Sequence, residues 1–398
     1  MLRLLLFLAG ISVLIIPEFL KVYYIMPFPG SQENDTIITA YMLHNNIWWF
    51  RLVGVAMIAW PVWKYVQTRK VWVMWPTIVA IGVWIFVVYL TNFVMLADKM
   101  FIQPNITKVV DVGMNKVPSA NLVVGVTVNG ESKAYPIEII GYHHQVRDSV
   151  GGKPVMVTYC TVCRTGRVFS PVVNGKLENF RLVGMDHFNA MFEDSRTRSW
   201  WRQVNGEAIA GALKGTKLEE IPSEQMSLAA WTAFHPGSKI LQPDSSFQER
   251  YDSLGLYDEG KLKGNLEKTD TIPWSRKSWV IGVAIDNDAK AYDWIETVRT
   301  HVVNDKVGET PVVVAIEGDD ASFHVWRRPD SLTFEFDTNG MKDNTGSSWN
   351  WQGVCVDGKL KDNKLEFQQA YQEYWHSWKT FRPNTNEYHE QERSLVGH

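Results

Sequence analysis

The balance of apolar and polar positions changes abruptly near residue 98. Val71–Ala97 contains 27 consecutive residues without a charged side chain, whereas a membrane-spanning helix needs only about 20 apolar residues. Two earlier apolar stretches predict further helices, and tryptophans lie near most of the expected helix ends, as in interfacial belts. We therefore predict a membrane anchor over 1–98 that contacts the lipid bilayer through three transmembrane helices, near 4–22, 47–66 and 71–97.

Basic residues predict the direction in which these helices cross the membrane. Arg3 precedes the first apolar stretch, and Lys64, Arg69 and Lys70 lie between the second and the third. The positive-inside rule places these residues in the cytoplasm, so three crossings leave everything after Asp98 outside. A cleaved signal peptide is an alternative for the first stretch, although it lacks a small-x-small cleavage site. Cleavage would not change the expected orientation of the other two spans.

The remainder of the chain has the pattern of short strands with a few helices. Leu122–Val128 and Lys133–Ile137 flank the turn signal Asn129-Gly130, which predicts a hairpin. Pro154–Tyr159 is another short apolar run that predicts a strand. Helical spacing is found in 137–146, 227–234 and 365–381. We therefore predict an α+β fold in which strands dominate.

This strand-rich region repeats itself. Residues 123–158 and 280–315 align without a gap and share 14 of 36 positions, including both Lys-Ala-Tyr triplets. Each copy later contains a Trp-x-x-Phe-x-Pro element, which begins at Trp231 and at Trp378. We predict a tandem duplication of a unit of about 140 residues. The expected parts are a first repeat at 101–242, a linker at 243–264, a second repeat at 265–390 and a tail at 391–398.

Composition limits the possible function classes. The chain has 398 residues, 45% hydrophobic and 21% charged, so it is not a disordered protein. Its formal net charge of −3 provides no electrostatic basis for a nucleic-acid partner. Three cysteines are too few for a disulfide-rich scaffold.

The one chemical motif is Cys160-Thr161-Val162-Cys163, which directly follows the predicted strand at 154–159. Two thiols at this spacing can form a redox couple or bind one metal ion. The matching positions of the second copy are Glu317 and Asp320, so the repeated fold does not require the thiols. This difference favours a functional dithiol, while a structural disulfide confined to the first copy remains an alternative.

Arg164 follows the second cysteine, and Arg167 lies three residues further on. The sequence after the motif predicts a turn into another strand, so no helix N-terminus is expected to activate a thiol as in thioredoxin-like proteins. Arg164 and Arg167 could instead stabilise a thiolate through their positive charges. The commoner role for both arginines is a solvated turn.

Metal binding is the second chemical hypothesis. Structural zinc is disfavoured because no second Cys/His pair accompanies the motif. Copper(I) could be bound by Cys160 and Cys163 with a histidine or methionine. His187 and Met191 would share one face of a helix. The candidate ligands are therefore Cys160, Cys163, His143, His187 and Met191.

The motifs resemble those of the domain of unknown function 3179 family. The resemblance rests on the run from Pro154 to Gly166, on Asn189-Ala190-Met191-Phe192-Glu193-Asp194 with the residues to Gly211, and on the closing Trp-x-x-Phe-x-Pro elements. It implies an exported or membrane-anchored bacterial protein and no assigned activity. Many members have Pro-Leu between the cysteines where this chain has Thr-Val, a difference that affects redox tuning.

Three functions remain open at this stage. The first is a thiol/disulfide redox centre at Cys160 and Cys163, with Arg164 in support and an extracytoplasmic protein as partner. The second is binding or delivery of copper(I). The third is a non-catalytic interaction module that contains a structural disulfide. For all three, the resemblance and the charge pattern imply the bacterial inner membrane, with the soluble part facing the periplasm or the outside.

Overall fold

The computed structural model describes residues 1–104 and 107–389, so the predicted tail at 391–398 lies outside the described residues. The chain forms two compact units. The first unit contains 1–102, 179–202 and 207–217, and the second contains 103–178, 203–206 and the residues from 218 onward. Part of the predicted first repeat, 179–217, therefore belongs mainly to the unit that contains the N-terminal helices.

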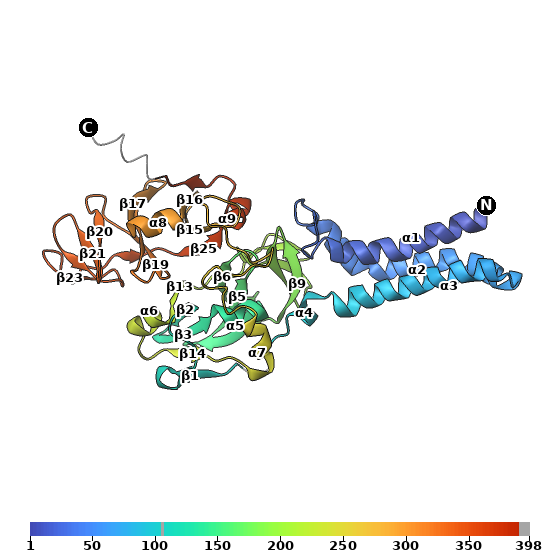
Figure 1. Cartoon of the computed structure of the whole chain (residues 1–398), viewed down its shortest axis with the longest axis horizontal. Helices are drawn as coiled ribbons and strands as arrows, with labels where there is room; N and C mark the ends of the chain where they lie inside the picture. The colour runs from blue at the N-terminus through green and yellow to red at the C-terminus, as the bar shows by residue number, and fades with distance from the viewer. Residues whose placement is uncertain (105–106, 390–398) are drawn as a thin grey trace. The chain divides into compact units, whose positions relative to one another are not determined.

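The first unit has three long helices that run side by side, drawn in blue in Figure 1. Two of them are long and apolar enough to cross a membrane, namely α1 (Leu2–Tyr23) and the continuous helical stretch Val71–Val94, which comprises α3 (Val71–Tyr89) and one π-helical turn. The predicted span at 47–66 lies inside α2 (Ile37–Thr68). Gly10 and Gly54 let α1 and α2 approach closely, because a Cβ atom at either position would lie 2.5 Å from a side chain of the other helix.

Polar side chains join the three helices near one end. The buried Glu18 of α1 accepts a 2.5 Å hydrogen bond from Arg51 of α2 and one from Asn92 at 3.1 Å. Lys21 lies 2.8 Å from the same carboxylate. Arg51 is therefore held in place by its ion pair with Glu18.

A four-stranded sheet completes the first unit. Its strand order is β12 (Ala208–Ala210), β11 (Trp200–Arg202), β10 (Asn189–Asp194) and β9 (Phe180–Asp186). Met191 and Trp200 of this sheet share a buried cluster with Val22 and Ala40 of the helices. The helices and the sheet therefore fold around one apolar core.

The first half of the second unit combines a five-stranded sheet with a three-stranded one. The larger sheet has the order β1 (Val109–Asp111), β14 (Lys239–Leu241), β3 (Glu131–Pro136), β2 (Leu122–Val128) and β13 (Ser223–Ser227). The smaller has the order β4 (Gln145–Val150), β5 (Lys153–Cys160) and β6 (Thr165–Phe169). The other elements are α5 (Ile137–His143), α6 (Leu228–Phe234) and the short pair β7 (Val172–Val173) and β8 (Lys176–Leu177).

The second half has three four-stranded sheets. The first contains β25 (Ala370–Tyr374), β15 (Trp279–Ile285), β16 (Asp288–Asp293) and β26 (Asn386–Glu387) in that order. The second contains β17 (Val302–Val307), β18 (Thr310–Ile316), β19 (Phe323–Arg327) and β24 (Glu366–Phe367). The third contains β20 (Phe334–Asp337), β21 (Gly340–Asp343), β22 (Ser348–Trp349) and β23 (Cys355–Asp357), and the helices are α8 (Trp294–Thr300) and α9 (Trp375–Phe381).

The repeated sequence motifs have the same structural role in both halves. Trp231 of α6 packs on Gly125 of β2, where a Cβ atom would lie 2.1 Å from the indole ring. Trp378 of α9 packs in the same way on Gly282 of β15, where the corresponding distance is 2.2 Å. Each glycine is therefore required because a large ring occupies the space of its missing side chain.

The Lys-Ala-Tyr triplets likewise build equivalent polar contacts. The Tyr135 hydroxyl donates to Asp148 at 2.9 Å, and Lys133 lies 3.1 Å from the same carboxylate. In the second half, Tyr292 donates to Asp305 at 3.1 Å and Lys290 lies 2.7 Å from it. These matched lysine–aspartate–tyrosine groups link a hairpin to the following strand in each half.

Two predicted segments differ from the structure. Helical spacing over 365–381 predicts one helix, but α9 covers only the end of this segment and is preceded by β24 and β25. The segment predicted as a linker, 243–264, contains α7 (Gln248–Asp252) and the buried side chains of Tyr251 and Tyr257. These tyrosines give the segment an apolar interior that its Gly, Asp and Lys content does not indicate.

Candidate functional site

The two cysteines lie at a tight turn between neighbouring strands. Cys160 is the last residue of β5, where it pairs with Thr165 at the start of β6, and Cys163 lies in the intervening turn. Arg164 has a φ angle of 54°, in the left-handed region, which reverses the chain into β6. Both cysteines are thiols and are fully buried. We refer to residues 160–164 as the dithiol turn.

Groups from distant parts of the second unit cover the dithiol turn. The Tyr374 amide donates a 2.9 Å hydrogen bond to the Cys163 carbonyl. The His376 ring donates to the Val162 carbonyl at 3.3 Å, and the Tyr257 hydroxyl donates to the Thr161 carbonyl at 2.8 Å. Three successive carbonyl groups of the turn therefore accept hydrogen bonds from residues after position 250. We refer to Tyr374–Ser377 as the covering segment.

The surroundings of the thiols are polar although they are buried. Burial raises the pKa of the Cys163 thiol well above its usual value, and a hydrogen bond with Cys160 raises that pKa further. A hydrogen bond with Ser377 of the covering segment has the opposite effect on the Cys163 pKa. Glu373 also acts on Cys163, and its negative charge raises this pKa.

The two arginines after the motif are fully buried, so the prediction of a solvated turn is wrong. Arg164 donates to the Gln372 side chain at 2.8 Å, and its guanidinium lies 3.7 Å from the centre of the Trp279 indole ring. Its remaining hydrogen bonds go to the carbonyls of Tyr257 and Asp258. Arg164 thus joins the turn to the rest of the second unit.

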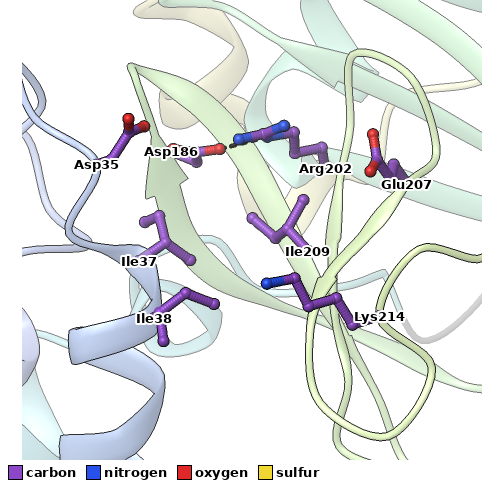
Figure 2. Close-up of a pocket in the computed structure, with 8 residues that line it drawn as sticks. All are labelled: Asp35, Ile37, Ile38, Asp186, Arg202, Glu207, Ile209 and Lys214. Carbon is purple, nitrogen blue, oxygen red and sulfur yellow. Dashed lines mark hydrogen bonds and ion pairs between the residues drawn. The ribbon is translucent and has the colours of Figure 1, made fainter.

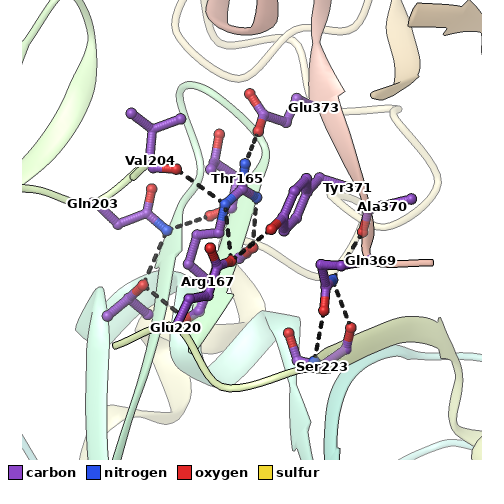
Figure 3. A network of polar contacts seen from close by, with 12 residues as sticks. Thr165, Arg167, Gln203, Val204, Glu220, Ser223, Gln369, Ala370, Tyr371 and Glu373 are labelled. Carbon is purple, nitrogen blue, oxygen red and sulfur yellow. Dashed lines mark hydrogen bonds and ion pairs between the residues drawn. The ribbon is translucent and has the colours of Figure 1, made fainter. Parts of the chain in front are cut away.

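Arg167 lies at the centre of the polar network in Figure 3. Its guanidinium contacts Glu373, and both side chains are completely buried. It also donates to the Val204 carbonyl at 3.1 Å and lies 3.3 Å from the centre of the Tyr371 ring. A buried ion pair of this kind requires all its remaining hydrogen bonds to be satisfied, which explains the density of the network.

The predicted metal ligands do not form a group. His143 is buried, and its ring shares a 2.7 Å hydrogen bond with the Tyr251 hydroxyl. His187 and Met191 belong to the first unit, on the hairpin of β9 and β10 and not on the helix that their spacing suggests. Within the described residues, no cluster of three or more His, Cys, Asp or Glu side chains could hold a metal ion.

His187 instead forms part of a charged cluster beside a cavity of the first unit. Its ring lies 2.6 Å from Asp186, a hydrogen bond that raises the His187 pKa, and Asp186 also contacts Arg202. Figure 2 shows the cavity, of about 260 Å³, with Asp186 and Arg202 beside the apolar side chains of Ile37 and Ile209. Asp186 and Arg202 pair with each other, and the rest of the wall carries charges of both signs from Asp35, Glu207 and Lys214, so the cavity itself indicates no ligand class.

Comparison with known proteins agrees with these motifs. Residues 102–385 match the family described as "Protein of unknown function (DUF3179)". The chain belongs to this family. The matched range of the DUF3179 family contains the dithiol turn and the covering segment, and it begins after the three long helices. No curated protein and no solved structure matches the chain.

Several site residues were not predicted from the sequence, among them Glu373, His376 and Ser377. A comparison of the two sequence copies nevertheless points to these residues. Counting back from the two Trp-x-x-Phe-x-Pro elements, these three polar residues match Met226, Ala229 and Ala230 of the first copy. The second half therefore carries polar groups at these three positions, where the first half has apolar ones.

Proposed function

We propose that this chain is a membrane-anchored extracytoplasmic protein whose dithiol, Cys160 and Cys163, exchanges electrons with a partner protein. The observation that carries the proposal is the placement of two hydrogen-bonded thiols in a buried polar environment. Core cysteines without a chemical role behave as small apolar residues and require no such surroundings.

The proposed reaction is thiol–disulfide exchange. The Cys160 thiolate attacks a partner disulfide, forms a mixed disulfide and releases one partner thiol. The Cys163 thiol then loses its proton and attacks Cys160, which forms the intramolecular disulfide and releases the second partner thiol. Two electrons and two protons thus pass from the dithiol to the partner. The same balance holds if the roles of Cys160 and Cys163 are exchanged, because both thiols are fully buried.

Exchange requires the site to open. Both sulfurs are buried, and in the described residues no two cysteines lie at disulfide-bonding distance. The covering segment holds the turn through the Tyr374 amide and the His376 ring. We therefore include in the proposal a separation of the covering segment from the turn, which admits the partner and lets the turn close into a disulfide.

The location is proposed from the helices and their charges. Two apolar helices of sufficient length and the basic residues Arg3, Lys64, Arg69 and Lys70 support a three-helix anchor with the dithiol outside. Equivalent glycine–tryptophan and lysine–aspartate–tyrosine contacts in the two halves support a tandem duplication. A reporter fused after Asp98 should be active only outside the cytoplasm, and a cytoplasmic reporter would refute the orientation.

The decisive experiment uses the full chain in detergent. Equilibration with dithiol/disulfide buffers should convert Cys160 and Cys163 reversibly between two thiols and one disulfide, and Cys163→Ser should accumulate a mixed disulfide through Cys160. Cys355→Ser is the matched control, because Cys355 is also buried but lies far along the chain in the second half. A reduction potential below about −300 mV would indicate a structural disulfide instead. Stoichiometric copper lost only in the Cys160/Cys163 double variant would replace the redox function by metal binding.

A further inference from the structure

The polar group that joins the three long helices contains two cations but one carboxylate. Glu18 lies 2.5 Å from Arg51 and 2.8 Å from Lys21. Its other hydrogen bonds come from the neutral side chains of Thr91 and Asn92, at 3.2 and 3.1 Å. Among the described residues, no second carboxylate pairs with Arg51 or Lys21. These five residues, which we call the helix-end cluster, therefore carry one positive charge in excess.

The hydrogen-bonding capacity of the helix-end cluster is used unevenly. Side chains on all three helices donate to the Glu18 carboxylate, and both of its oxygens are occupied. Arg51 donates through Nε to Glu18 and through Nη2 to the Asn92 side chain at 3.2 Å. Its Nη1 group donates to no atom of the described residues. A guanidinium has five N–H donors in a rigid fork, so Arg51 keeps donors available for a further acceptor.

The excess charge is poorly accessible to water. Glu18 is fully buried, while Lys21 is 4% exposed and Arg51 is 15% exposed. A buried charge without a partner is strongly unfavourable, and more so where the surroundings are lipid. Because Arg51 is the more exposed of the two cations and has donors available, a compensating anion would contact Arg51.

The helix-end cluster lies at one end of the two apolar helices. Glu18 and Lys21 belong to the last two turns of α1, and Asn92 belongs to the last turn of the stretch Val71–Val94. In the proposed anchor this end faces the outer side of the membrane, because Arg3, at the start of α1, lies on the cytoplasmic side. The cluster therefore lies near the level of the outer lipid headgroups.

Exposed tryptophans agree with this level. The Arg51 guanidinium lies 4.6 Å from the centre of the Trp48 ring, and Trp48 and Trp49 are both largely exposed, as is typical of the headgroup region. A similar contact occurs at the opposite end of the helices, where Arg3 lies 5.4 Å from the centre of the Trp60 ring. Arg3 is exposed, so water can solvate its charge. Arg51 lacks this access, so it is the arginine that requires an anion.

We propose that Arg51 binds the phosphate group of one anionic phospholipid, and that this lipid supplies the negative charge that the helix-end cluster lacks. Arginine suits this role because its planar fork matches phosphate oxygens in a bidentate arrangement. A phospholipid with one net negative charge balances the excess charge of the cluster. A zwitterionic phospholipid brings an ammonium group as well and leaves the excess unchanged. The inference rests on the proposed membrane anchor and is independent of the redox function.

The test measures lipid binding to the full chain in detergent by native mass spectrometry. Phosphatidylglycerol is the anionic probe, and phosphatidylethanolamine is the zwitterionic one. We expect one phosphatidylglycerol molecule to bind each chain at concentrations at which phosphatidylethanolamine does not. Inorganic phosphate, added as a competitor, should not displace the lipid, because the acyl chains also contribute to binding. Displacement by phosphate would show a site for a soluble anion and would overturn the assignment to a lipid.

Two variants should change the affinity in opposite directions. Arg51→Gln removes the excess charge and leaves Glu18 paired with Lys21, so phosphatidylglycerol should bind about fivefold more weakly, the effect expected for one basic residue at a membrane surface. Glu18→Gln adds to the excess positive charge and should strengthen binding by a similar factor. Arg3→Gln is the matched control, because it removes an arginine beside a tryptophan at the opposite end of the helices. It should leave the affinity unchanged.

The results separate this inference from the membrane anchor. If the chain needs detergent for extraction from membranes but binds both lipids equally, the lipid site is refuted and the anchor stands. The same conclusion follows if Arg51→Gln and Arg3→Gln bind phosphatidylglycerol alike. If alkaline carbonate releases the chain from membranes, the anchor itself fails. The comparison of the two lipids uses the unchanged protein, so it does not depend on the folding of any variant.

Discussion

Gln225 and Gln372 hydrogen-bond to each other at 2.6 Å across the middle of the second unit. They occupy matching places in the two copies, each six residues before the tryptophan of a Trp-x-x-Phe-x-Pro element. Gln372 in addition accepts a hydrogen bond from Arg164, whereas the position that matches Arg164 in the second copy is Ala321. The contact thus joins matching residues of two halves that carry different side chains around it.

Loosening the covering segment should expose the thiols. His376→Ala removes the donor to the Val162 carbonyl, and an unsatisfied buried carbonyl costs roughly 1–3 kcal/mol. We expect faster labelling of Cys160 and Cys163 by a thiol reagent in the native protein. Labelling of Cys355 provides an internal reference and should not change.

Ser322→Ala is the matched control for that experiment. Ser322 accepts a 3.0 Å hydrogen bond from the Ser227 amide, where α6 of the first half meets the second half. Its loss should destabilise the protein to a similar extent without faster labelling of the dithiol. Equal acceleration in both variants would mean that global unfolding, and not the covering segment, controls access.

The dependence of stability on pH should change in opposite directions in two variants. Burial lowers the pKa of His376 to about 3, so the unfolded chain binds this proton more readily and stability is lost as pH falls below the ordinary histidine value. The free energy of unfolding of His376→Gln, relative to that of the unchanged protein, should therefore increase by about 1.4 kcal/mol for each pH unit from 6 down to 4.

Asp258 provides the opposite case. Burial raises its pKa to about 6, so the folded protein binds this proton more readily and its contribution to stability is lost as pH rises from 4 to 6. The stability of Asp258→Asn relative to the unchanged protein should therefore increase with pH over that interval. Chemical denaturation at several pH values measures both differences, and parallel curves would contradict the assigned pKa values.

The buried ion pair beneath the site should be far more important than a surface pair. Among the described residues, Glu373→Gln leaves the buried Arg167 with Glu220, at 3.6 Å, as its one charged partner. We expect a loss of about 3–5 kcal/mol in the free energy of unfolding. Glu366→Gln, which removes an exposed pair with Arg327, should cost no more than about 1 kcal/mol.

The two strand glycines should tolerate no side chain. A Cβ atom at Gly125 or Gly282 would overlap the ring of Trp231 or Trp378, and overpacking of this kind typically costs about 1–3 kcal/mol. Gly82→Ala in α3 is the control, since nothing lies within 4 Å of the added methyl group. Thermal melting should show a large decrease for the first two variants and none for the third.

The elements that could be predicted from the sequence are those specified by local pattern. The hairpin of β2 and β3, the strand β5 and the turn after Cys163 lie where alternation and the Asn129-Gly130 signal place them. The hairpin with His187 and Met191 was missed because residues four apart fit a helical period by chance. The prediction for the segment that ends in α9 fails for a related reason, since aromatic residues at helical spacing, Tyr371, Tyr374 and Trp378, continue from β25 into α9.

The sequence predicts the two cysteines at the centre of the candidate site but not the residues that surround them. Cys160 and Cys163 are only three positions apart along the chain, so their proximity follows from the sequence without knowledge of the fold. The burial of Arg164 and the approach of Tyr374 and His376 depend on how the two halves of the second unit pack, which no local pattern encodes. Differences between the two copies, such as His376 against Ala229, were the one sequence signal that pointed to these residues.

Each half of the second unit supplies a hydrogen bond at or beside the turn of the other half. The Tyr374 amide, from the second half, closes the dithiol turn of the first, and Ser227, from the first half, bonds to Ser322 beside the matching turn of the second. A polypeptide with a single half would therefore lack the residues that bond to its turn, and its own bonding residues would have no turn to contact. A second molecule of the same polypeptide could supply both.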